Sequence, residues 1–279
     1  MQDIFQLIQS CAVEVYKLLK KSSGESSGNI NSSGDSQLKF DVIADQIITQ
    51  KLLSCPAVYE ICSEEQENSI KGNKDGNLCI AYDPLDGSSV FESNFLVGSI
   101  FGIYEHHFEA KNLIASAYIL YGFNLEIVIA TQKVLHYRYD GTEFVCIGEL
   151  KLNSKGKINS PGGTQKNWTL PHKTRIESLF DAGYRLRYSG AMVADLHQIL
   201  KKGGGLFSYP ATTDSPQGKL RLLFEVLPFA FLFEKAGGGA IDGKTRLLER
   251  QVDSLHATSA CFFGSMEEIQ QIQEKLKED

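Results

Sequence analysis

Seven consecutive residues concentrate the chemistry of this 279-residue chain: Asp83-Pro84-Leu85-Asp86-Gly87-Ser88-Ser89. They follow the apolar run 78–82, which its flanking turn residues mark as a short buried strand. Pro84 fixes its own φ and drives Asp83 into an extended conformation, so the carboxylates are held in place. Carboxylate and carbonyl oxygens are the ligands that Mg²⁺ prefers, while the glycine and serines offer N–H and hydroxyl groups to an anion. The segment predicts a divalent cation beside a phosphate; the simpler alternative is a polar surface turn.

Further acids stand where a cation could use them. Glu64 and Glu65 follow the strand-like segment 58–62, and Glu225 interrupts the apolar run 222–227. Because an isolated buried carboxylate is costly, Glu225 needs a positive partner. From the residues alone, a salt bridge with Arg221 at i−4 is favoured over a metal ion.

The seven-residue motif resembles the signature of fructose-1,6-bisphosphatases, within the Mg²⁺-dependent, lithium-sensitive sugar and inositol phosphatases. Further blocks resemble this family in the same order, and the resemblance extends over about residues 35–239. These blocks are 63–65, 100–104, 187–195 and 218–225.

The resemblance implies a metal-dependent enzyme in which water attacks the phosphate directly. Two or three Mg²⁺ ions per site, with Mn²⁺ or Zn²⁺ as alternatives, would be bound by Glu64, Asp83, the Leu85 carbonyl, Asp86 and Glu225, and by Asp35 when a lid closes. Asp41 and Glu65 would orient and deprotonate the water. Taken singly, each of these two acids would be interpreted as a solvated surface residue.

The resemblance also divides the substrate between two subsites. Gly87, Ser88 and Ser89 would receive the scissile phosphate. Tyr188, Tyr209 and Lys219 would bind the second phosphate, and Arg187 would reach in from a neighbouring subunit. Without the resemblance, packing tyrosines and a solvated lysine would be the better interpretation.

One loop departs from the family. Where many members have an Asn and a Tyr, this chain has Ser160-Pro161-Gly162-Gly163-Thr164-Gln165, which looks more like sedoheptulose-1,7-bisphosphatases, whereas Tyr209-Pro210 follows the fructose pattern. The expected reaction is hydrolysis of the 1-phosphate of fructose 1,6-bisphosphate to fructose 6-phosphate, a step of gluconeogenesis. Alternatives are a sedoheptulose-1,7- or dual-specificity bisphosphatase, an inositol-monophosphatase-like enzyme, and a non-catalytic binding protein.

Regulated family members also carry an AMP pocket, which this chain does not match. Their Lys-Tyr pair is replaced by Asn77-Leu78, and their Arg by Glu105. We therefore expect no inhibition by AMP at that site.

Bulk properties limit partners and location. A net charge of −6 disfavours nucleic acid and anionic membranes, and the run 226–233 is too short and too polar to span a bilayer. The chain shows no signal pattern, and its six cysteines have no paired spacing, so a reduced cytoplasmic setting with buried thiols is expected. The partners expected are a small sugar bisphosphate and copies of the same chain, as a tetramer.

Periodicity places these residues on elements. A helix is predicted over 3–21, a low-complexity stretch over 22–34 that is either a linker or a catalytic lid, and then a helix that carries Asp41 and Asp45. An antiparallel meander is predicted from strands 97–104, 113–121, 125–131, 134–139 and 143–147. Ser265 and Glu268 indicate a capping box for a last helix. We expect an α/β (α+β) fold, a layered α-β-α-β-α sandwich, with domains 1–154 and 155–279.

Overall fold

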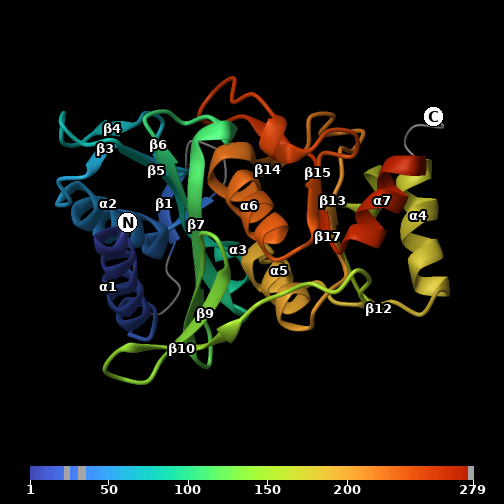
Figure 1. The fold of residues 1–279 in the computed structure, drawn as a ribbon, viewed down its shortest axis with the longest axis horizontal. Helices are drawn as coiled ribbons and strands as arrows, with labels where there is room; N and C mark the ends of the chain where they lie inside the picture. Colours follow the sequence, from blue (N-terminus) through green and yellow to red (C-terminus); the bar gives the residue numbers. More distant parts are fainter. Residues whose placement is uncertain (22–25, 31–35, 276–279) are drawn as a thin grey trace.

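The protein is built in five layers, as Figure 1 shows for the computed structural model, which describes residues 1–21, 26–30 and 36–275. Helices α1 and α2 cover one face of an eight-stranded sheet. Helices α5 and α6 fill the space between this sheet and a five-stranded sheet, whose far side is covered by α4 and α7. This arrangement confirms the predicted α-β-α-β-α sandwich.

The eight-stranded sheet has the strand order β10-β9-β8-β7-β6-β5-β3-β4, and all its pairs are antiparallel except β3 with β5. The predicted meander is confirmed, with boundaries within two residues of those expected. The strands are β3 (Val58–Ser63), β4 (Ile70–Lys71), β5 (Leu78–Asp86), β6 (Val97–Glu105), β7 (Leu113–Tyr121), β8 (Leu125–Ala130), β9 (Val134–Tyr139) and β10 (Phe144–Glu149).

The five-stranded sheet has the order β12-β11-β13-β17-β15, parallel on one side of β13 and antiparallel on the other. Its strands are β11 (Ile158–Pro161), β12 (Arg185–Leu186), β13 (Leu206–Tyr209), β15 (Gly239–Ile241) and β17 (Cys261–Gly264). Two small sheets pair β1 (Ser26–Ile30) with β2 (Ser36–Leu38) and β14 (Leu220–Arg221) with β16 (Thr258–Ser259). The domain boundary at residue 154 stays a prediction.

The helices include the two predicted near the N-terminus. The first was expected over 3–21 and spans Gln2–Leu19, and the second carries Asp41 and Asp45. Residues 26–30 of the stretch 22–34 form β1. The rest of the predicted lid, and Asp35, lie outside the described residues. The helices are α1 (Gln2–Leu19), α2 (Lys39–Leu53), α3 (Ser88–Phe91), α4 (Leu170–Asp181), α5 (Met192–Lys201), α6 (Leu227–Lys235) and α7 (Met266–Lys275).

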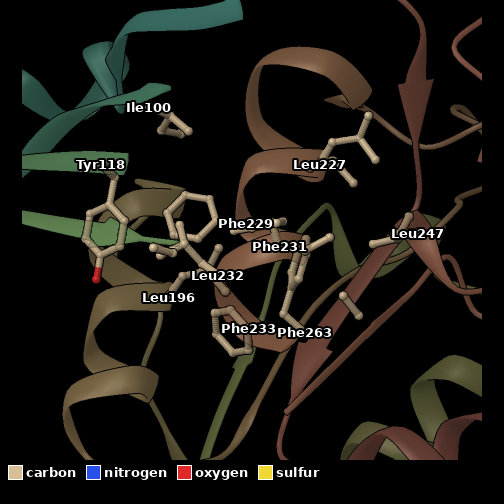
Figure 2. Close-up of a cluster of buried hydrophobic side chains, with 14 of the residues drawn as sticks. Ile100, Tyr118, Leu196, Leu227, Phe229, Phe231, Leu232, Phe233, Leu247 and Phe263 are labelled. Atoms are coloured by element: carbon tan, nitrogen blue, oxygen red, sulfur yellow. The ribbon is translucent and has the colours of Figure 1, made fainter. Parts of the chain in front are cut away.

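The largest core joins the two sheets through α6. This helix is apolar on nearly all sides because both of its faces are covered. Figure 2 shows Phe229 of α6 near Tyr118 of the first sheet, and Phe233 near Phe263 of the second. The rings of Tyr118 and Phe229 have their centroids 5.1 Å apart. The core therefore fixes the two sheets, and the residues at their ends, relative to each other.

Two local predictions were wrong. The strand expected over 78–82 continues to Asp86, because β6 pairs with β5 beyond an irregularity that accommodates Pro84. The capping box does not form: the Glu268 carboxylate accepts hydrogen bonds from Gly156 N–H (2.7 Å) and Tyr184 O–H (2.7 Å), while Ser265 Oγ accepts one from Gly205 N–H. The side chains of Glu268 and Ser265 therefore accept hydrogen bonds from buried donors of other elements, and not from each other's backbone N–H groups.

The cysteines agree in part with the expectation of buried thiols. All six cysteines are free thiols and five are buried, but Cys146 lies exposed on β10. Within the described ranges, no helix combines the length and apolar character needed to cross a membrane.

Candidate active site

Three carboxylates meet where β5 ends against the start of α6. Asp83 and Asp86 lie in the last part of β5, and Glu225 lies in the π-helical turn Leu222–Val226 that leads into α6. Each offers a carboxylate oxygen, and these oxygens lie within 4.8 Å of one another. All three side chains are buried. The fold thus brings together acids from distant parts of the sequence.

Backbone groups hold the two aspartates in place. Asp83 Oδ1 accepts the N–H of Leu85 at 2.9 Å, and the Pro84 carbonyl accepts the hydroxyl of Ser99 at 2.7 Å. Asp86 Oδ2 accepts the N–H of Val193 at 2.7 Å, in the first turn of α5. The positive end of this helix therefore faces a carboxylate.

The predicted Arg221–Glu225 pair takes a different form. Glu225 Oε2 accepts the backbone N–H of Arg221 at 2.6 Å. The guanidinium lies instead beside Glu64, with Nε 3.7 Å from Oε1, and donates to the His256 carbonyl at 3.0 Å. Because a π-helical turn starts at Leu222, Arg221 is not on a regular helical face with Glu225. Glu225 is thus oriented by the backbone and remains close to two other acids.

Burial and mutual repulsion make the ionised forms of these acids unfavourable unless a cation is bound. Burial, with the nearby charges of Glu65 and Asp86, raises the pKa of Glu64 to about 7. Burial raises the pKa of Asp86 to about 7 although the Val193 N–H opposes the change. The pKa values of Asp83 and Glu225 are also raised, by burial and then by Glu64 and Asp86. A divalent cation with oxygen ligands fits this donor set.

The remaining predicted site residues lie on α2, after β3 and within β5. Asp41 is 3% exposed and lies in the first turn of α2. Asp45, one turn later, accepts hydrogen bonds from Tyr82 O–H (2.9 Å) and Gln66 Nε2 (2.6 Å), which anchors α2 to β5. Glu65 is partly buried directly after β3, and Leu85 is buried between the two aspartates of β5.

The turn after Asp86 depends on glycine. Gly87 has φ +83°, and a Cβ there would lie 2.4 Å from the Cβ of Ala191. Ser88 and Ser89 follow as the first residues of the short helix α3. The turn predicted to receive the scissile phosphate therefore packs tightly against the residue that precedes α5.

Of the residues predicted for the second phosphate, the two tyrosines lie next to one glycine. A Cβ on Gly162 would lie 2.5 Å from the ring of Tyr209 and 3.0 Å from that of Tyr188, so the departing loop lies against both tyrosines. Lys219 is exposed just before β14. Arg187 is exposed, and its Nη1 donates to the Leu186 carbonyl at 2.7 Å.

Sequence reasoning missed a second cluster, between β8, β9 and α5. Glu126 accepts from His136 (3.0 Å) and from Arg138 (2.8 Å), and His197 Nε2 lies 3.9 Å from the same carboxylate. Lys201 Nζ lies 3.3 Å from the other ring nitrogen of His136. Because Arg138 and Lys201 already supply positive charge, these groups form a structural ion-pair network and a poor cation site. The cross-strand pairing of Glu126 with Arg138 was the available signal.

In this geometry a cluster of buried carboxylates lies beside a glycine–serine turn, and its oxygen atoms could hold a divalent cation. Models for the N-terminal and C-terminal domains of fructose-1-6-bisphosphatase match residues 5–149 and 152–277. A fructose-1,6-bisphosphatase class 1 of Helicobacter hepaticus is 56% identical over 272 residues, 97% of this chain and 98% of the relative. One of Campylobacter jejuni is 52% identical over 274 residues, 98% of each chain. The chain belongs to the fructose-1,6-bisphosphatase family.

Solved structures agree with this assignment. The holo form of Leishmania major fructose-1,6-bisphosphatase matches with a TM-score of 0.93 at 28% identity, covering 99% of this chain and 94% of the other. A provisionally named sedoheptulose-1,7 bisphosphatase of Toxoplasma gondii matches with a TM-score of 0.91 at 31% identity, with the same coverage. Both substrate names therefore occur among close structural neighbours.

Proposed function

We infer that this enzyme hydrolyses the 1-phosphate of fructose 1,6-bisphosphate, releasing fructose 6-phosphate and phosphate. The observation that carries the inference is the convergence of Asp83, Asp86 and Glu225 beside the turn at Gly87. The names of the relatives supply the substrate, and the two phosphate subsites expected from the sequence suit a bisphosphate.

The metal-binding role is assigned to Glu64, Asp83, the Leu85 carbonyl, Asp86 and Glu225, with Asp35 from the predicted lid. Bound Mg²⁺, with Mn²⁺ or Zn²⁺ as alternatives, would neutralise phosphate charge, lower the pKa of water and stabilise the leaving alkoxide. The raised pKa values of Glu64 and Asp86 support this assignment. They show that nearby protein cations do not balance the negative charge of these buried acids, and a metal ion would balance it.

Side chains and backbone groups of the protein would orient the water and bind the two phosphates. Asp41 and Glu65 would orient the attacking water and accept its proton. Gly87, Ser88 and Ser89 would hold the scissile phosphate through N–H and hydroxyl groups. Tyr188, Tyr209 and Lys219 would hold the distal phosphate, with Arg187 contributed by a neighbouring copy in a homo-oligomer, a tetramer in our proposal.

A phosphate-release assay with Mg²⁺ tests this function. We expect turnover of fructose 1,6-bisphosphate and little release from inositol 1-phosphate, which has no second phosphate for the distal subsite. Release from inositol 1-phosphate alone would contradict the proposal and favour the monophosphatase alternative. A metal-free sample and the Asp86→Asn variant serve as blanks.

Sedoheptulose 1,7-bisphosphate is the second candidate substrate. The observation that favours it is the contact of the small Gly162 with both tyrosine rings, together with the similarity to the Toxoplasma gondii structure. Comparison of kcat/KM for the two bisphosphates in one assay decides between them. We further propose that the enzyme acts in the cytoplasm.

A further inference from the structure

Asp195 is a buried carboxylate to which the proposed reaction gives no role. It lies in the first turns of α5 and is 4% exposed. Its Oδ1 and Oδ2 accept the backbone N–H of Ser189 at 2.8 and 3.1 Å. The Ser189 hydroxyl in turn accepts the Ala191 N–H at 3.2 Å and lies 3.3 Å from the Ala191 carbonyl. Residues 189–191 are thus held as a closed turn on the start of α5.

This turn stands between the two predicted phosphate subsites. On one side it continues into Tyr188, whose ring lies beside Gly162 and the loop of the distal subsite. On the other side Ala191 contacts Gly87, and the next turn of backbone holds Asp86 through Val193. One short segment therefore connects the group that would hold the distal phosphate with the group that would hold the scissile phosphate.

We propose that Asp195 is a positioning residue that fixes the distal phosphate subsite relative to the scissile one. The proposal rests on the function inferred above. An ionised carboxylate accepts the Ser189 N–H with both oxygens, and charge-assisted hydrogen bonds to a buried acceptor restrict a turn strongly. Without this restraint, Tyr188 and the preceding Arg187 would adopt several positions, and the substrate's second phosphate would lose its fixed partners.

Asp195→Asn separates positioning from general damage. The amide keeps the shape but offers one acceptor oxygen and directs an NH₂ group toward the Ser189 N–H. Asp86 keeps its own hydrogen bond in this variant, because its donor is the backbone N–H of Val193.

Steady-state kinetics give the test. In Asp195→Asn we expect KM for fructose 1,6-bisphosphate to rise about ten-fold, with kcat within about two-fold of wild type. The inhibition constant of fructose 6-phosphate should rise by the same factor. Inhibition by inorganic phosphate, the Mg²⁺ concentration for half-activation and hydrolysis of fructose 1-phosphate should stay as in wild type. Asp140→Asn is the matched control, since Asp140 accepts two backbone N–H groups, at 2.7 and 2.9 Å, in an exposed turn remote from the site.

The outcomes are distinguishable. An unchanged KM would overturn the positioning role. So would inhibition constants of phosphate and fructose 6-phosphate that rise by the same factor, together with a higher Mg²⁺ concentration for half-activation. If Asp195→Asn does not fold, Asp195→Glu keeps the charge but displaces the carboxylate from the Ser189 N–H, and it should raise the same two constants. No rise in that variant overturns the proposal. A wild type that releases no phosphate from fructose 1,6-bisphosphate would instead contradict the proposed function.

Discussion

Asp86 and Glu225 each give one oxygen to a backbone N–H group, of Val193 and Arg221, while contributing charge to the acid cluster. Substitution of these acids by the matching amides separates the two roles. Asn and Gln can still accept the backbone N–H through their own oxygen, but they bring no charge to a cation.

We predict that Asp86→Asn or Glu225→Gln lowers kcat more than ~10³-fold in saturating Mg²⁺, because the metal's stabilisation of the transition state is worth several kcal/mol. Phosphate release and circular dichroism, measured together, check the loss of rate and the retained fold. A variant that keeps a tenth of wild-type activity would contradict the ligand assignment.

A second prediction at this scale concerns pH. Without metal, the pKa values of Glu64 and Asp86 lie near 7, above their ordinary values. These groups therefore stabilise the folded chain at low pH and lose that contribution as pH rises through about 7. A bound cation reverses the loss, so the rise in Tm on adding millimolar Mg²⁺ should be small at about pH 5.5 and larger at about pH 8.

Thermal unfolding across this pH range, with Asp86→Asn as control, measures the effect. A shift in Tm that is the same at every pH would show that the cation does not bind these carboxylates. The control should show a smaller shift at the alkaline end.

Single residues could be predicted where a local pattern carried the chemistry. The motif at 83–89 gave the two aspartates and the glycine turn directly. The partners of Arg221 could not be found in this way, because they depend on a π-helical turn and on His256, which precedes β16 and lies 35 residues away in sequence. The capping box predicted for Glu268 failed for the same reason. Its carboxylate accepts hydrogen bonds from two buried donors that are distant in sequence.

At the scale of elements, helix α5 links the halves of the molecule. Its first turn holds Asp86, and His197 farther along contacts the network formed by Glu126 and His136 on β8 and β9. Predicted strands and helices matched the structure well where periodicity was clear. The docking of α5 on the sheet was not predictable, since it is decided by these tertiary contacts.

Glu126→Gln should lower the free energy of unfolding at neutral pH by about 1–3 kcal/mol, because His136 is left buried without its anionic partner. Burial opposes ionisation of Glu126, but hydrogen bonds from His136 and Arg138 outweigh it and lower its pKa to about 2. Since this pKa lies below the ordinary value of 4.5, the stabilisation is present above that value and is lost as pH falls toward 2.

Urea unfolding at neutral and acid pH measures both effects. Glu149→Gln is the control, because its pairs with Lys133 and Lys151 are exposed and should contribute at most about 1 kcal/mol. An equal difference between wild type and Glu126→Gln at all pH values would mean that the charge of Glu126 has no part in it.

At the scale of the whole molecule, the proposed role of Arg187 makes one chain an incomplete enzyme. We predict at least an isologous dimer, and predict that mixing Arg187→Ala with Asp86→Asn chains restores roughly half of the wild-type turnover per mixed dimer, since one of its two composite sites is intact. Differently tagged chains allow mixed dimers to be purified and assayed. No rescue in verified mixed dimers would place Arg187 in the site of its own chain.

The last prediction is that AMP does not inhibit cooperatively. Leu78 is buried in the core beneath α1 and α2, and Glu105 is exposed at the end of β6, where it would repel a phosphate. Without differential binding there is no free energy to shift a conformational equilibrium. Titration to millimolar AMP in the Mg²⁺ assay checks this, and cooperative inhibition at micromolar AMP would contradict it.

The meeting of acids from both halves of the chain also has a consequence for biosynthesis. During translation, Glu64, Asp83 and Asp86 leave the ribosome long before Glu225 and Arg221. The emerging N-terminal half thus holds only part of the acid cluster, and the full cluster exists only after α5 and α6 have packed on the sheet. With the proposed ligands, a cation would bind only the chain whose two halves have docked, and its binding would stabilise that state late in folding.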